Sequence, residues 1–301
     1  MTEFAVGSVQ GQESSRVVAI AREQVFELPD APTMVDLLAD WDDWIDRIAA
    51  AIDDGSLGDG AELSGVDLGA PLPVPRNLYM AGANYADHAR EMRKLPADAP
   101  IEPSPHGPFF FLKPTTTVIG PDAEVVIPTG IERLDWEVEL AAVIGREARG
   151  LDAATALSCV AGYMVLNDVS ARDNFKREPA TEPPMTFDWF GQKGWATSCP
   201  TGPWIVPARF VPDPGDLRMS LSVNGEVEQS SSTGEMIFDL PTQIAYLSRV
   251  VPLVPGDVIA TGTPAGVGAG KGRFLAPGDE MVAAIEDLGE LRSRVVAEVL
   301  R

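Results

Sequence analysis

Cysteine, histidine and long apolar runs are all scarce in this 301-residue chain, and each scarcity excludes a class of protein. Only Cys159 and Cys199 are present, too few for a disulfide framework, so a reducing cytoplasm is the expected location. Two histidines, His88 and His106, cannot form a three-histidine zinc site. No apolar run reaches the roughly 18 residues of a transmembrane helix, and the first residues lack the pattern of a secretory signal.

Positive charge is also scarce. The chain has 23 lysines and arginines against 45 aspartates and glutamates, which gives a net charge of −22. Nucleic acids and anionic membranes need a basic surface, so neither is an expected partner. An anionic substrate would be repelled unless its site supplied local positive charge, from a metal ion or from Lys and Arg.

The remaining composition favours a globular protein of one small and one large unit. Apolar residues make up 45% of the chain, enough for a substantial core. Residues 1–72 form the predicted small N-terminal domain, with a hairpin over residues 17–28 and a helix over residues 34–52 that Thr33 caps. A proline-rich linker leads into the predicted catalytic domain, residues 73–301.

Short apolar runs that alternate with Gly and Pro turns fill this second domain. Asn224 and Gly225, between two alternating segments, predict a β-hairpin. Besides a short helix that begins near Ala86, helices are predicted over residues 154–162 and 236–251. The pattern therefore predicts a mixed, β-rich α+β fold.

One apolar strand begins with two carboxylates. Glu137 and Glu139 are two residues apart, so they point to the same side of the strand that continues to Gly145. A second apolar run ends at Asp168, which could meet them across a strand pair. A divalent cation would relieve the repulsion, and oxygen ligands favour Mg²⁺, Mn²⁺ or Ca²⁺ over Zn²⁺. The alternative is two surface glutamates and a helix-capping aspartate.

A second candidate feature is a short predicted helix that begins near Ala86. His88 and Glu91 lie three residues apart on it and share a face, so Glu91 could orient His88 as a general base. The alternative is an ordinary surface ion pair. Arg172 and Lys193 are the nearest candidate cations for a substrate carboxylate or an oxyanion.

Two common catalytic motifs do not fit this chain. The glycine-rich stretch that begins at Gly262 lacks the Lys-Ser/Thr pair of a phosphate-binding loop, which argues against ATP. A nucleophile elbow of the G-x-S-x-G type is also missing.

From about residue 78 to residue 296 the chain resembles the fumarylacetoacetate hydrolase family. Seven stretches occur in the family's order: GANYADHAREM, FFFLKPTTTVIGP, DWEVELAAVIGREARG, VAGYMVLNDVSARD, QKGWATSCPTGPWIVP, VNGEVEQSSSTGEMIF and VPGDVIATGTPAGVG. Within this family, the chain resembles bacterial acylpyruvases and 2-hydroxyhepta-2,4-diene-1,7-dioate isomerases. It implies a rolled, barrel-like sheet in the catalytic domain.

The resemblance also assigns roles to residues. It implies Mg²⁺ or Mn²⁺, with Ca²⁺ possible in crystals, on Glu137, Glu139 and Asp168. It makes His88 and Glu91 a water-activating dyad and Lys193 the catalytic lysine. Substrate binding is assigned to three further residues, Arg172, Thr263 and Tyr85.

The sequence departs from relatives at a few positions. Ala83 stands where several relatives carry a larger or basic residue, and Phe175 where many have Gln. Residues 174–192 are longer than in short members and are read either as a lid or as a dimer contact. These departures leave the substrate open.

The predicted activity is hydrolysis of a carbon–carbon bond in a small diketo acid, an acylpyruvate or fumarylpyruvate, that releases pyruvate or a related acid. The same site could instead run an oxaloacetate-type decarboxylation or a hydroxymuconate-type isomerisation. A third alternative is a non-catalytic scaffold with a structural metal. The expected partners are a small oxo acid and, as in relatives, a second copy of the chain in a homodimer.

Overall fold

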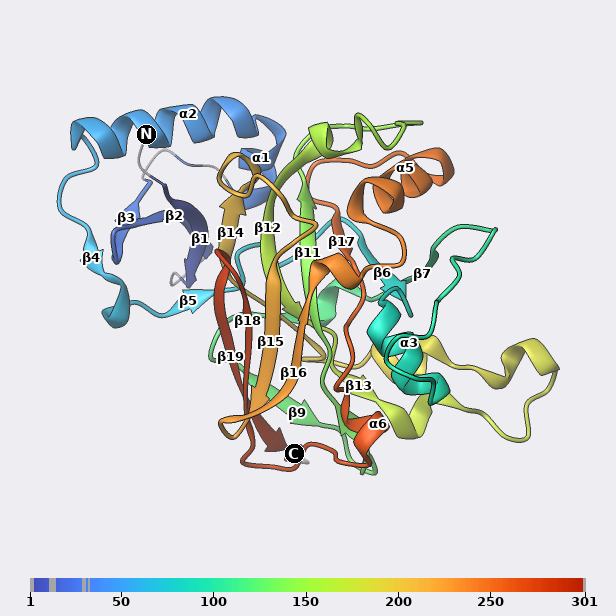
Figure 1. Ribbon diagram of the computed structural model, residues 1–301. Helices are drawn as coiled ribbons and strands as arrows, with labels where there is room; N and C mark the ends of the chain where they lie inside the picture. Colours follow the sequence, from blue (N-terminus) through green and yellow to red (C-terminus); the bar gives the residue numbers. More distant parts are fainter. Residues whose placement is uncertain (1–2, 11–14, 29–30, 32, 300–301) are drawn as a thin grey trace.

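A twelve-stranded sheet forms the centre of the protein. The structure is a computed structural model that describes residues 3–10, 15–28, 31 and 33–299 (Figure 1). In order across the sheet, the strands are β4 (Ala61–Glu62), β3 (Gln24–Glu27), β2 (Ser15–Ala21), β1 (Ala5–Gln10), β14 (Cys199–Pro207), β12 (Val160–Asn167), β11 (Val138–Ile144), β17 (Val258–Ala260), β6 (Leu78–Gly82) and β7 (Phe109–Leu112). Off this path, β5 (Leu68–Gly69) pairs with β1 and β8 (Val118–Ile119) pairs with β14.

A second sheet of five strands packs against β12 and β14 (Figure 1). Its order is β16 (Glu226–Ser232), β15 (Arg218–Val223), β18 (Glu280–Ile285), β19 (Gly289–Ala297) and β9 (Glu124–Ile127). The predicted hairpin at Asn224-Gly225 joins β15 to β16, and both turn residues have positive φ, 53° and 79°. A short pair, β10 (Leu134–Asp135) and β13 (Ser170–Ala171), lies next to the start of β11 and the end of β12.

The neighbouring strands β11 and β12 are buried along their whole length. Alternate side chains of β11 enter different cores. Val138 and Leu140 join the core shared with the second sheet, whereas Ala141 and Val143 join the core shared with the N-terminal helices. Burial of each large aliphatic side chain contributes roughly 1.5–3 kcal/mol, so this pair of strands is firmly held. Any charged group on it must therefore find a partner inside the protein.

The N-terminal residues extend the same central sheet. Val6 of β1 pairs with Ile205 of β14, and the predicted hairpin forms from β2 and β3. The helices α1 (Met34–Ala39) and α2 (Trp41–Asp54) lie over β1–β3, and their apolar faces join a core that also contains Leu78 and Met80 of β6 (Figure 1). The division at residues 72 and 73 stays a prediction.

Four further helices follow along the described part of the chain. They are α3 (Ala86–Arg93), α4 (Trp189–Lys193), α5 (Leu240–Val250) and α6 (Gly268–Lys271). Figure 1 shows α3 close to β6 and β7, and α6 near the end of β13. Within the described residues, the helices are too short or too polar to span a bilayer.

Three details of the predicted fold are wrong. The sheet does not close into a barrel in the described part of the chain, because β4 and β7 lie at opposite edges and do not pair. The helix predicted over residues 154–162 is a 3₁₀ turn, Ala156–Cys159, followed by β12, because pairing with β11 outweighs local helical preference. The helix predicted over residues 34–52 is interrupted at Asp40.

Candidate active site

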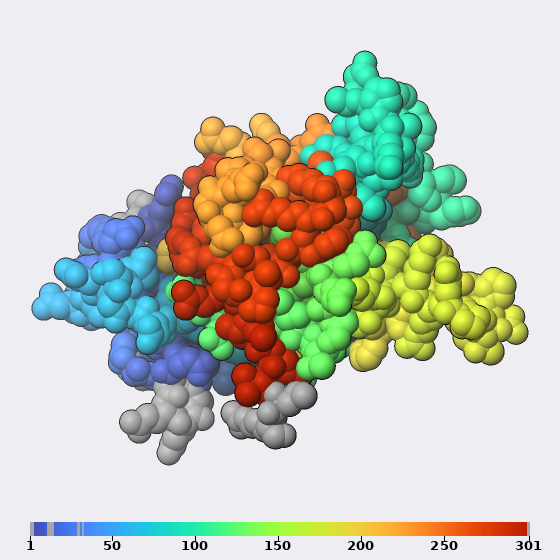
Figure 2. Space-filling model, turned by 90° about the horizontal axis from the view of Figure 1, so that it is seen from below, coloured from blue at the N-terminus to red at the C-terminus, as the bar shows by residue number. Residues whose placement is uncertain are grey.

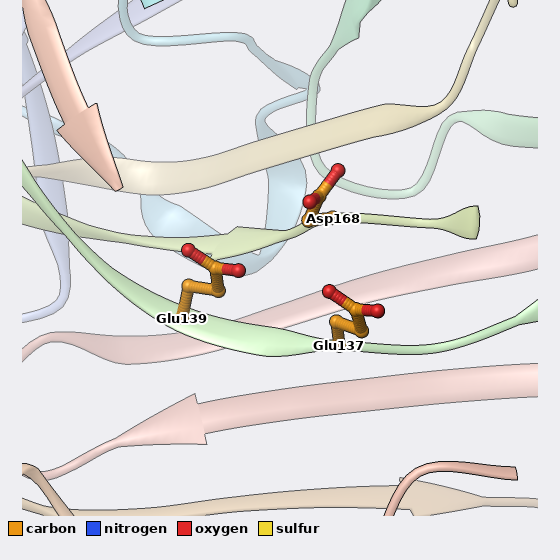
Figure 3. Close-up of side chains that lie close together, drawn as sticks. All are labelled: Glu137, Glu139 and Asp168. Carbon is orange, nitrogen blue, oxygen red and sulfur yellow. The ribbon is translucent and has the colours of Figure 1, made fainter. Parts of the chain in front are cut away.

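Three carboxylates meet where β11 begins and β12 ends. Antiparallel pairing places Val138 opposite Asn167, and the amide of Asp168 donates to the carbonyl of Glu137 at 2.8 Å. One carboxylate oxygen from each of Glu137, Glu139 and Asp168 lies within 4.8 Å of the other two, and all three residues are buried. In Figure 3, Glu137 and Glu139 project to the same side of β11, toward the chain segment that carries Asp168. The structure thus brings together the three residues that the sequence singled out.

The electrostatics of these acids are uneven. Burial raises the pKa of Glu139 well above its usual value, and the charges of Asp168 and Glu137 raise it further. Burial also opposes ionisation of Glu137, but the charges of Lys193 and Arg172 outweigh that effect and lower its pKa to about 2. Glu139 is therefore the acid that most lacks a positive partner.

Three cations flank Glu137 and Asp168, and the two lysines among them are buried. Lys193 Nζ lies 2.7 Å from Glu137 Oε2 and 2.6 Å from Asp168 Oδ2. Lys113 Nζ binds the other oxygen of Asp168 at 2.6 Å. Arg172 Nη2 lies 2.6 Å from Glu137 Oε1, and its Nε donates to Asp135 Oδ2 at 2.8 Å. Among the described residues, Glu139 accepts a hydrogen bond only from the amide of Gly262, at 2.8 Å.

This arrangement fits a divalent cation. Glu139 is 1% exposed, faces two other carboxylates and has no basic side chain bonded to it in the described chain. A buried carboxylate among like charges is costly unless a cation balances it. A set of three carboxylate oxygens suits Mg²⁺ or Mn²⁺.

Sequence reasoning missed Lys113 and Asp135. Lys113 ends an apolar run in the same way that Asp168 does, and Asp135 is the last residue of the short strand β10. A charged residue at the border of a strand was therefore the signal for both. Asp135 is fully buried and accepts hydrogen bonds from the amides of Gly268 and Ala269, at 2.6 and 3.0 Å. It positions Arg172, and through it Glu137.

His88 and Glu91 share one face of α3, as the spacing predicts. His88 Nδ1 lies 3.6 Å from Glu91 Oε2, slightly beyond hydrogen-bonding distance. This nitrogen is buried and has no hydrogen-bond partner within the described residues. A positive charge on His88 would lower the pKa of Glu137, so the imidazole lies within electrostatic reach of that acid.

The three predicted substrate-binding residues occupy different settings. Tyr85 is fully buried, with its hydroxyl 3.5 Å from the sulfur of Met219, and burial raises its pKa. Thr263 Oγ1 accepts a hydrogen bond from Gln229 at 2.9 Å, and Gln229 also accepts from the amide of Val138. Arg172 is engaged by acids as described above. Their contact with a substrate stays a prediction.

Residues 174–192 form a lobe beside the site. Trp189 stacks on Phe111 with ring centres 5.1 Å apart and meets Phe175 edge-on at 5.3 Å. Phe187 and Phe190 remain 52% and 69% exposed. Figure 2 shows the lobe, in yellow, projecting from the body. The aromatic contacts anchor the base of the lobe on β7, and both interpretations, lid and dimer contact, stay open.

Comparison with known proteins adds an independent line of support. The model of the fumarylacetoacetate (FAA) hydrolase C-terminal family matches residues 77–296. A mitochondrial oxaloacetate tautomerase of Homo sapiens is 41% identical over 229 residues, which is 75% of this chain and 68% of that protein. The family model covers every candidate metal ligand and both residues of the proposed dyad, since all lie within residues 77–296: Glu137, Glu139, Asp168, His88 and Glu91.

Two solved structures share the fold over nearly the whole chain. A 2-hydroxyhepta-2,4-diene-1,7-dioate isomerase of Mycobacterium marinum has a TM-score of 0.74 and 30% identity, and covers 99% of this chain and 100% of that one. A maleylpyruvate hydrolase of Sphingobium, solved with manganese(II) and pyruvate, has a TM-score of 0.76 and 28% identity, and covers 98% and 100%. The chain therefore belongs to the fumarylacetoacetate hydrolase family.

Proposed function

We propose that the protein is a divalent-metal-dependent enzyme that hydrolyses a carbon–carbon bond in a small diketo acid of the acylpyruvate type. The observation that carries the proposal is the cluster of three buried carboxylates within 4.8 Å, near an imidazole that is paired with a carboxylate. The manganese and pyruvate in the related hydrolase structure support both the metal and the class of product.

Glu137, Glu139 and Asp168 would hold Mg²⁺ or Mn²⁺. When bound, the ion would polarise the oxygen atoms of a 2-oxo acid and supply positive charge beyond that of Lys113, Lys193 and Arg172. The pairing of Glu137 with Lys193 and Arg172 keeps its carboxylate ionised, which is the form that binds a cation.

The side chains around the acids would carry the proton and charge transfers. His88, oriented by Glu91, removes a proton from water, and the hydroxide adds to the distal carbonyl carbon of the substrate. Lys193 has three N–H groups and uses two on Glu137 and Asp168, which leaves one for the developing oxyanion. Collapse of the adduct breaks the carbon–carbon bond. The electron pair remains on the pyruvate fragment, which takes up a proton.

The first experiment compares turnover of acetylpyruvate before and after removal of metal. We expect EDTA to abolish turnover and Mg²⁺ or Mn²⁺ to restore it, and ¹⁸O from water to enter the acetate product. Full activity in excess EDTA would refute the metal-dependent proposal.

Keto–enol isomerisation is the second candidate, because the 41% identical human relative is named an oxaloacetate tautomerase. Here His88 would move a proton on the substrate instead of on water. Oxaloacetate assayed beside acetylpyruvate separates the two, since tautomerisation changes enol absorbance without releasing a new acid. Decarboxylation of oxaloacetate would instead release CO₂. A scaffold without activity would show none of these changes.

Assembly and location remain expectations. We expect a homodimer, which light scattering after size-exclusion chromatography would measure, and a cytoplasmic location, which cell fractionation would test.

A further inference from the structure

The backbone of the glycine-rich loop after β17 has no role in the chemistry proposed so far, yet its amides bind three acids of the site. Its amides donate to Glu139 from Gly262, to Glu91 from Gly266, and to Asp135 from Gly268 and Ala269. Gly266 binds both oxygens of Glu91 at 3.1 Å. One short segment therefore sets the position of the metal-site acid, the dyad acid and the acid behind Arg172.

This loop has little freedom to move. Gly266 has φ +101°, and a methyl group added to it would lie 2.1 Å from the carbonyl oxygen of Glu228 on β16. The carbonyl of Gly266 also accepts a hydrogen bond from the indole of Trp136, at 3.1 Å. Lys271 binds the side chain of Glu228 at 2.7 Å. The backbone is thus held against β16 and against Trp136, which precedes β11.

Gly270 is the point at which this fixed backbone meets the dyad. A methyl group added at Gly270 would lie 2.9 Å from both Cδ and Oε1 of Glu91, and 3.2 Å from Cγ. These are the three nearest atoms, and all belong to the far end of one flexible side chain. The φ of Gly270 is not positive, so the backbone itself accepts alanine.

We propose that Gly270 is a positioning residue: its missing side chain leaves the space in which the Glu91 carboxylate stands beside His88. This inference rests on the proposed function of the dyad. The loop cannot retreat from an added methyl group, so Glu91 must move. Ordinary van der Waals contact begins near 3.4 Å, whereas the added methyl group would lie 2.9 Å from the carboxylate. Glu91 must therefore move by at least the difference between these two distances. The neighbouring His88–Glu91 separation is already 3.6 Å and would change with it.

The test is a double-mutant cycle on Gly270→Ala and Glu91→Asp, with acetylpyruvate and Mn²⁺. Misplacement of a catalytic group by about an ångström reduces the rate by up to about 100-fold. We expect Gly270→Ala to lower kcat by about tenfold while KM and Mn²⁺ affinity stay within about twofold. Aspartate is shorter and withdraws from the methyl group, so Gly270→Ala should change the Glu91→Asp enzyme by less than about twofold.

The matched control is Gly65→Ala. Gly65 has no atom within 4 Å of an added methyl group and no positive φ, so the same substitution there should leave kcat unchanged. An unchanged kcat in Gly270→Ala would overturn the inference. Equal losses in the wild-type and Glu91→Asp backgrounds, or a fall in Mn²⁺ affinity, would also overturn it, because the residue would then act through the fold or the metal site.

A measurement without substrate separates this inference from the proposed function. The chain has only two histidines, so ¹⁵N-histidine labelling reports His88 with His106 as an internal reference. We expect Gly270→Ala to shift the imidazole nitrogen signals of His88 and leave those of His106 in place. If no oxo acid is turned over but His88 shifts, the positioning stands and the proposed reaction fails. If turnover is metal-dependent but His88 does not shift, the inference alone fails.

Discussion

Replacement of Glu139 by glutamine tests the electrostatic account of the acid cluster most directly. The substitution keeps the shape of the side chain and removes its charge. In metal-free protein this should stabilise the fold, because burial and the charges of Asp168 and Glu137 all raise the pKa of Glu139 and so oppose its ionised form. With metal present the effect should reverse, because one of three proposed ligands is weakened.

The size of the effect follows from the separation of the charges. Two like charges at 4.8 Å repel by roughly 3 kcal/mol at an effective dielectric constant of about 20. Lys193 offsets part of this repulsion. A net gain of about 1–3 kcal/mol is therefore expected, and with about 2 °C per kcal/mol for a chain of this size, Tm in EDTA should rise by about 2–6 °C. Loss of a ligand should weaken Mn²⁺ binding by roughly 100-fold or more.

The pH dependence has a definite sign. The pKa of Glu139 is near 4.5 in the unfolded chain and is raised in the folded protein. Below pH 4.5 the carboxyl group is therefore protonated in both the folded and the unfolded state, so wild type and Glu139→Gln should be similarly stable. As pH rises toward the folded pKa, wild type loses stability relative to the variant. Differential scanning calorimetry in EDTA across this range measures the difference, with exposed Glu147→Gln as the control. A lower Tm for Glu139→Gln at pH 7, or unchanged Mn²⁺ affinity, would refute the reasoning.

Three further predictions concern neighbouring groups. Lys113→Met should lower the free energy of unfolding by roughly 3 kcal/mol in urea titrations, because it leaves a buried oxygen of Asp168 without its partner; a change below about 1 kcal/mol would contradict the pairing. Glu91→Gln should lower kcat by about 100-fold. Burial opposes ionisation of Glu91, but its contacts with His88 and the amide of Gly266 outweigh burial and lower its pKa, so the stability difference between Glu91→Gln and wild type should shrink as pH falls below about 4.5. Trp189→Ala should speed proteolysis within residues 174–192 by removing contacts with Phe111, and an unchanged cleavage rate would argue against anchoring there.

Much of the site was visible in the sequence because its residues lie at the borders of apolar strands. The period of two along β11 placed Glu137 and Glu139 on one side, and the helical spacing of His88 and Glu91 placed them on one face. The Asn224-Gly225 hairpin formed for the same local reason, since few residues accept positive φ at both turn positions. Patterns that depend on neighbouring residues in the chain were therefore predicted well.

Other features depend on segments far apart in the chain. Residues 154–162 have a helical composition, but β12 is extended because it pairs with β11 on one side and β14 on the other. A sheet closes into a barrel only if its two edge strands pair with each other. Here the edge strands are β4 and β7, which lie more than 40 residues apart along the chain and do not pair. Local propensity amounts to tenths of a kcal/mol per residue and yields to such pairing.

The sequence by itself determined which residue types were available: three acids in apolar settings, two histidines, and too little positive charge for nucleic acid. Only the tertiary structure decided how those charges are balanced. It brought Lys113, 55 residues away in the chain, onto Asp168, and a glycine loop onto Glu91 from 175 residues away. Charge pairing and close backbone approach are properties of distance in space, and spacing along a chain fixes that distance only within a single helix or strand.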